Sequence, residues 1–146
     1  MAIAGFLGTI LERKGSAVWS ISPDATVFEA IQLMADKNVG ALPVVDNSRL
    51  IGIISERDYT RKVILKGQSS KDTPVRDIMM REVLTASPSD TIEDCVRVMT
   101  EKRVRHLPVL EGTKMIGIVS IRDVMKWVIS AQAEEIERWK PIVGAW

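Results

Sequence analysis

The chain has 146 residues, of which 46% are hydrophobic and 27% charged, and its 20 basic and 19 acidic residues leave a formal net charge of +1. This length suits one compact domain or two small halves that share an interior. The even charge balance excludes a global field for holding nucleic acid or an anionic membrane, so any basic patch has to be local. The single cysteine, Cys95, excludes an internal disulfide and predicts a reducing compartment such as the cytoplasm.

The N-terminal stretch MAIAGFLGTILERK resembles a signal sequence only in part. No basic residue precedes its apolar run, and Gly and Thr interrupt that run, so we expect a docking segment instead. No stretch in the chain approaches about 18 uninterrupted apolar residues, and a membrane-spanning segment is therefore not expected.

Short apolar stretches open each half of the chain, VWSI at 18–21 and VLTA at 83–86, and each predicts a strand that ends at a Ser-Pro turn. A helix is expected next, because Thr26 and Thr91 each precede an acidic residue by the spacing of a capping box. Apolar residues recur with helical period in both segments, and Cys95 lies among them, which predicts a core role for this thiol over a redox role.

Two further strands follow in each half, and a polar turn joins each pair into a predicted hairpin. The second strands end at Ser55 and Ser120, where further helices are expected to begin. The first of these helices should stop near Gly67, and the second should run from about Ile121 toward Pro141. The strand runs are 41–45 and 50–54 in the first half, and 106–110 and 115–119 in the second.

An internal repeat relates the two halves. The heptads GIISERD (52–58) and GIVSIRD (117–123) are 65 residues apart, and the same shift aligns 18–59 with 83–124 without a gap. A match of this length indicates one small fold used twice. We expect an α+β fold, an α/β sandwich of two β-α-β-β-α repeats related by a pseudo-two-fold axis. The expected boundaries are 1–67 for the N-terminal segment and first repeat, 68–74 for a polar linker, 75–130 for the second repeat, and 131–146 for a C-terminal helix extension and tail.

The doubled pattern consists of SP-x-x-T, then a run that ends in h-P-V, then G-h-h-S-x-x-D, where h is hydrophobic. Over roughly residues 9–130 it resembles a tandem pair of cystathionine β-synthase (CBS) domains, and the chain looks like a stand-alone CBS-pair protein. The resemblance implies a non-catalytic regulatory module, commonly a homodimer, that signals to a partner by conformational change. It also implies that AMP, ADP or ATP, or alternatively NAD or S-adenosylmethionine, binds in clefts between the repeats, with no cofactor required.

The resemblance assigns roles position by position. It implies that Asp58 and Asp123 bond the ribose hydroxyls and that Ser55 and Ser120 reach ribose or phosphate. The residues just before each Leu-Pro are implied to contact phosphate, and these are Gly40 and Ala41 in the first copy and Arg105 and His106 in the second.

The chemistry of these residue types supports a nucleotide site. A carboxylate can accept hydrogen bonds from both hydroxyls of a ribose diol, while phosphate favours Arg side chains and helix N-termini. Arg57 and Arg122 directly precede the two aspartates, and Arg103 extends the basic run RVRH of the second copy. Ser20 and Thr85 belong to the apolar stretches that we expect to line the adenine slot.

The two clefts are not expected to be equal. The second copy has RVRH at 103–106, whereas the first has NVGA at 38–41, which offers phosphate only backbone groups near its end. We therefore expect different affinities, or occupancy of one cleft only.

Simpler interpretations stay open for the same residues. A Ser at the N-cap with an Asp three residues later explains each heptad as a helix cap. Arg57 and Arg122 could be solvated helix residues, and His106, the only histidine, could be structural. No Cys, Asp or Glu lies at metal-ligand spacing from His106, so a metal site is not expected.

Other function classes are less favoured. We find no nucleophile–base pair or phosphate loop, so an enzyme is not expected. An interaction scaffold or nucleic-acid-binding CBS protein is the alternative, but Phe and Tyr total three residues and the Trp residues lie away from the Arg clusters. The late aromatics Trp127, Trp139 and Trp146, with the segment at 5–11, instead predict a homodimer interface.

Overall fold

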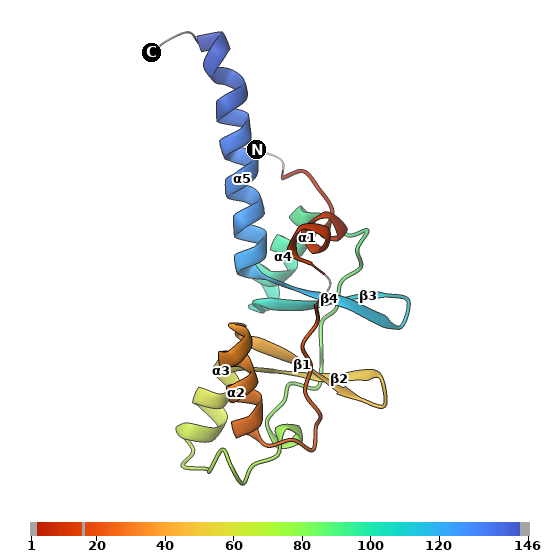
Figure 1. Ribbon diagram of the computed structural model, residues 1–146, viewed down its shortest axis with the longest axis vertical. Coiled ribbons are helices and arrows are strands. Elements are labelled where there is room, and N and C mark those ends of the chain that lie inside the picture. The colour runs from red at the N-terminus through yellow and green to blue at the C-terminus, as the bar shows by residue number, and fades with distance from the viewer. Residues whose placement is uncertain (1–2, 16, 144–146) are drawn as a thin grey trace.

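The computed structural model describes residues 3–15 and 17–143, and Figure 1 shows their arrangement. The α+β fold predicted from the sequence is confirmed. Within the described residues, none of the helices combines the length and apolar character that a bilayer crossing requires. In chain order the elements are α1 (Leu7–Lys14), α2 (Val27–Lys37), β1 (Ala41–Asp46), β2 (Arg49–Ser55), α3 (Glu56–Tyr59), the π-helical turn η1 (Thr60–Ile64), the 3₁₀ turn η2 (Val75–Asp77), α4 (Ile92–Lys102), β3 (His106–Glu111), β4 (Lys114–Ser120) and α5 (Ile121–Val143).

Both predicted hairpins are present and follow the same register. β1 pairs antiparallel with β2, and β3 pairs in the same way with β4. Asn47 and Ser48 have φ values of 49° and 64°, which a two-residue loop needs to match the twist of its strands. The second strand of each hairpin ends at a serine that lies opposite the first residue of the first strand. Ser55 lies opposite Ala41, and Ser120 lies opposite His106.

The strands predicted at 18–21 and 83–86 are wrong in extent. Only Ile21 and Ala86 pair with a hairpin, each through a single parallel bridge to β1 or β3. The Ser-Pro turn follows immediately in both copies, and proline has no N–H to extend a ladder. Each sheet therefore consists of two strands, with Ile21 or Ala86 bridging to β1 or β3, and Met80 also bridges to β2 in the first sheet.

The helices begin at the predicted caps. Thr26 Oγ1 accepts a hydrogen bond from the Glu29 amide at 3.1 Å, and Thr91 Oγ1 accepts one from the Asp94 amide at 3.0 Å. Cys95 on α4 is buried, and this burial, with a smaller effect of the nearby Asp90 carboxylate, raises the pKa of its thiol to about 11. The thiol therefore stays protonated at neutral pH, as suits a core residue.

The second helix of each repeat differs in length. After Ser55 the chain forms α3 and continues as η1, and Gly67 follows with a φ of 70°, as a C-terminal stop requires. After Ser120 the chain forms the long helix α5, which extends beyond the hairpins in Figure 1.

Each hydrophobic core is completed by a segment from outside its own hairpin and helices. Val75, Ile78 and Met79 lie in the first core, beside the buried residues of α2, β1 and β2. Leu7 and Ile10 of α1 lie in the second core, beside those of α4, β3 and β4. The N-terminal segment therefore packs on the second repeat, and the segment after the linker packs on the first. The residue boundaries predicted for the repeats stay a prediction, but the cores extend across them.

A glycine in each heptad allows this packing. A Cβ atom on Gly52 would lie 2.6 Å from Met79 Sδ, and one on Gly117 would lie 2.6 Å from Leu11 Cδ2. Such distances are shorter than a van der Waals contact, so a side chain at either glycine would force Met79 or Leu11 to shift.

Trp127 on α5 is turned toward the N-terminal segment. Its indole Nε1 donates to the Ala4 carbonyl at 2.9 Å, and the Arg13 guanidinium lies 4.5 Å from the ring centre. Trp127 is therefore half-buried within the chain, and its predicted role in a dimer interface stays a prediction. The side chains of Trp139 and Trp146 lie outside the described part of the structure.

Because α1 packs into the core of the second repeat, we predict that it is a structural part of that repeat. Leu7 is fully buried at 0% exposure, and Leu7→Ala should lower the free energy of unfolding by about 2–5 kcal/mol through the cavity it leaves. Leu65 is 74% exposed, and the control Leu65→Ala should cost about 0.5 kcal/mol or less. Urea unfolding of both variants measures the difference, and equal losses would show that α1 does not contribute to the core.

Candidate functional site

We call the open end of each hairpin, where a serine starts the next helix, a rim. At the first rim, at the open end of the β1–β2 hairpin, Ser55 and Asp58 form a capping box. The Ser55 amide donates to Asp58 Oδ2 at 2.9 Å, and the Asp58 amide donates to Ser55 Oγ at 3.2 Å. Ser55 Oγ also donates to Asp58 Oδ2 at 3.0 Å. The Gly40 carbonyl accepts the Glu56 amide at 3.1 Å, which places Gly40 and the neighbouring Ala41 at the same helix start. The capping interpretation of this heptad is confirmed.

The second rim repeats this geometry at the end of the β3–β4 hairpin. The Ser120 amide donates to Asp123 Oδ2 at 2.8 Å, and the Asp123 amide donates to Ser120 Oγ at 3.1 Å. The Arg105 carbonyl accepts the Ile121 amide at 2.8 Å, as the Gly40 carbonyl does in the first rim. His106 lies directly opposite Ser120 in the hairpin.

The two rims meet across the pseudo-two-fold axis. A Cβ atom on Gly40 would lie 3.5 Å from His106 Nε2, which places the imidazole against the backbone of the other repeat. The half-buried aspartates thus belong to neighbouring rims joined by this contact, one from each repeat.

Each aspartate also has a lysine partner. Lys62 Nζ lies 3.2 Å from Asp58 Oδ1, one helical turn along the chain. Lys14 Nζ of α1 lies 2.8 Å from Asp123 Oδ2 and donates to the Ile118 carbonyl at 2.8 Å. The two carboxylates are paired alike, but the second receives its cation from the exchanged N-terminal helix.

The remaining predicted residues surround the rims at the surface. The side chains of Arg57, Arg122 and Arg105 are exposed. Arg103 ends α4 in the left-handed conformation, with a φ of 55°, as Asn38 ends α2 with a φ of 54°. Ser20 and Thr85 are exposed and directly precede the bridging residues of the two sheets. The ligand roles predicted for these residues stay predictions.

Comparison with known proteins identifies the fold family. The family model of the CBS domain matches residues 15–64 and again 75–130. The chain belongs to the CBS domain family, as a tandem pair of CBS domains. This confirms the resemblance drawn from the doubled heptads.

Relatives of this CBS pair include plant and bacterial proteins. A CBS domain-containing mitochondrial protein of Arabidopsis thaliana, CBSX3, is 44% identical over 85% of the chain, which spans 62% of that relative. The structure of a putative signal-transduction protein with CBS domains from Burkholderia ambifaria is 44% identical, with a TM-score of 0.85 over 88% of this chain and 96% of that one. A hexameric CBS-CP12 protein from bloom-forming cyanobacteria is 29% identical, with a TM-score of 0.74 over 82% of this chain and 70% of that one.

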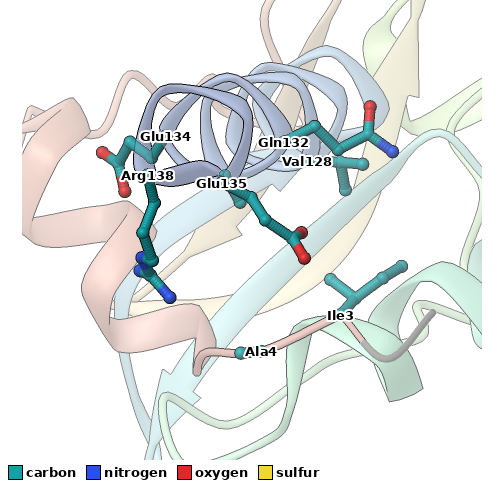
Figure 2. A pocket seen from close by; sticks show the side chains of 8 residues that line it. Ile3, Ala4, Val128, Gln132, Glu134, Glu135 and Arg138 are labelled. Carbon is teal, nitrogen blue, oxygen red and sulfur yellow. The ribbon is translucent and has the colours of Figure 1, made fainter. Parts of the chain in front are cut away.

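A groove of about 400 Å³ lies away from the rims of the CBS pair, between the N-terminal segment and α5. Ile3 and Ala4 form one side, and Figure 2 shows Glu135 and Arg138 extending from α5 on the other. None of the predicted nucleotide-binding residues lines it. The sequence provides no motif for this groove, since it arises only when the N-terminal segment docks along α5.

Sequence reasoning missed the two lysines at the rims. Lys62 follows Asp58 by four residues, which is the ordinary spacing of a helical ion pair and could have been found. Lys14 lies 109 residues from Asp123 in the chain, and no local pattern connects them.

The electrostatics of the second rim favour a neutral imidazole and an ionised carboxylate. Burial has the largest effect on His106 and lowers its pKa below the usual 6.5, and Lys14 and Arg105 act in the same direction against Asp123. For Asp123, burial alone would raise the pKa, but the hydrogen bonds from Lys14 and Ser120 outweigh it and lower the pKa below its usual value.

The lowered pKa of His106 predicts a loss of stability in mild acid. The unfolded chain takes up the imidazole proton near pH 6.5, before the folded chain does, so the free energy of unfolding should fall as the pH drops through this value. Thermal unfolding between about pH 7.5 and 5.5 should show a larger drop in Tm for the native chain than for His106→Gln, which cannot titrate there. Equal drops in both proteins would contradict the assigned burial of the imidazole.

Proposed function

We propose that this CBS pair binds an adenine nucleotide or a related adenosyl ligand at its rims and acts as a non-catalytic regulatory module. The observation that carries the proposal is the pair of half-buried carboxylates, Asp58 and Asp123, at adjoining rims from the two repeats. Each carboxylate is held by backbone amides of a helix start. Such a fixed acceptor suits the two hydroxyl donors of a ribose.

The surroundings of the carboxylates supply groups for the rest of such a ligand. Among the described residues, the hydrogen bonds to Asp123 from Lys14 and Ser120 both fall on Oδ2, which leaves Oδ1 as an acceptor. The exposed Arg105 and the neighbouring His106 can bind phosphate, as can the amides of the helix starts. In our proposal AMP, ADP or ATP fits these groups best, and NAD and S-adenosylmethionine share the adenosyl part.

The position of the rims explains how binding could become a signal. A ligand that contacts both repeats stabilises one relative packing of the repeats over others, and a partner protein that distinguishes these packings would read the ligand. The Burkholderia neighbour, described as a putative signal-transduction protein, supports this class of function.

The nucleotide proposal predicts that the two aspartates control binding. In calorimetric titrations with AMP, ATP, NAD and S-adenosylmethionine, at least one ligand should bind the native chain. The double variant Asp58→Ala with Asp123→Ala should bind it at least about tenfold more weakly, because charged hydrogen bonds to the ribose are lost. The control Asp36→Ala, an exposed carboxylate on α2, should leave binding unchanged. Unchanged affinity in the double variant would contradict the site, and no binding by the native chain would contradict the function.

We also propose that the chain forms a homodimer through α5. Met125 and Ile129 lie one turn apart on this helix and are 49% and 60% exposed. Exposed apolar side chains at this spacing are typical of a helix face that packs on another protein. The hexameric CBS-CP12 neighbour shows that a related fold assembles with itself.

The dimer proposal predicts a mass of twice 16.2 kDa by light scattering at micromolar concentration. The double variant Met125→Asp with Ile129→Asp should shift this mass toward the monomer, because charges would be buried in the interface. The control Leu84→Asp, at an exposed residue outside α5, should remain dimeric. A native monomer, or a dimer that persists in the α5 variant, would exclude this interface.

A further inference from the structure

Lys14 is held in a fixed position at the second rim. Its ammonium group donates to the Ile118 carbonyl on β4 and to Asp123 Oδ2, both at 2.8 Å. An ammonium has three N–H donors, so one remains after these two bonds. The side chain is 33% exposed, so this last donor is within reach of a molecule that enters from solvent.

The first rim has a different group at the corresponding place. The backbone hydrogen bonds of the two crossing segments match with a shift of 68 residues, which relates Lys14 to the exposed Glu82. The 65-residue shift of the hairpins relates Ile118 to Ile53, and the Ile53 carbonyl accepts a hydrogen bond from the Met80 backbone amide at 2.9 Å. At the second rim a charged side chain thus replaces a neutral backbone donor, which breaks the symmetry of the repeats.

This replacement changes the charge balance of the two rims. At the first rim the charges of Asp58 and Lys62 cancel, and Gly40 and Ala41 add none. At the second rim Asp123 is opposed by Lys14 and by Arg105, whose charges both act on the imidazole of His106. The second rim therefore combines a ribose acceptor with a net positive charge, which is the combination that a phosphorylated nucleoside requires.

We propose that Lys14 is a specificity-determining residue, which makes the second rim select phosphorylated adenosyl ligands such as AMP over unphosphorylated ones such as adenosine. This inference rests on the proposed nucleotide-binding function. Because Lys14 is the last residue of α1, the exchanged N-terminal helix becomes part of the ligand site as well as of the core.

The test compares AMP and adenosine on the same proteins by calorimetry. Lys14→Met removes the charge and keeps an unbranched side chain, and it should weaken AMP binding about tenfold while adenosine affinity changes less than about twofold. Lys14→Arg, which keeps the charge, should retain most of the preference for AMP. Lys114→Met removes the same charge at the opposite end of β4 and should change neither affinity.

The same titrations in an Asp58→Ala background isolate the second rim, where AMP binding and its dependence on Lys14 should persist. Loss of AMP binding in that background would place the ligand at the first rim and overturn the inference. Equal weakening of AMP and adenosine by Lys14→Met would also overturn it. Tighter binding of both ligands would show that Lys14 only competes for Asp123, which is a third contradiction. Failure of the native chain to bind either ligand would instead contradict the nucleotide-binding function itself.

Discussion

The structure depends on the close packing of a distant segment of the same chain against the glycine of each heptad. Each hairpin and its helix leave one side of their core open, and a segment from elsewhere in the chain closes it. The Met79 and Leu11 side chains of these segments lie over Gly52 and Gly117, where an added Cβ atom would force them to shift. The exchange ties the two repeats together, because neither core is complete without a crossing segment.

The position of the rims follows from the same packing. The hairpins end at Ser55 and Ser120, and the backbone amide of each serine donates to the aspartate three residues later. Since the repeats face one another, the two helix starts adjoin, and His106 lies against Gly40 of the other repeat. A helix cap, which would be an ordinary stabilising feature in one repeat, becomes the edge of a shared polar surface when it occurs twice.

The departures from symmetry give the molecule its individual properties. The Ile118 carbonyl of the second repeat accepts a hydrogen bond from the Lys14 side chain, whereas the related Ile53 carbonyl accepts one from the Met80 backbone amide. Burial and the nearby cations keep His106 neutral, and Asp123 stays ionised beside it. The second rim is thus richer in positive charge than the first, because Lys14 of α1 and Arg105 both lie there.

Local patterns in the sequence determined the hairpins, the helix caps at Thr26 and Thr91, and the paired serines and aspartates of the heptads. These features depend on neighbours within a few residues, so spacing alone can show them. The one-residue bridges of 18–21 and 83–86, the inward orientation of Trp127 and the approach of Lys14 to Asp123 were decided by the tertiary structure. Each of these features depends on which distant segment completes each hydrophobic core. That pairing is decided by how well whole surfaces pack together, and a short stretch of sequence carries no information about it.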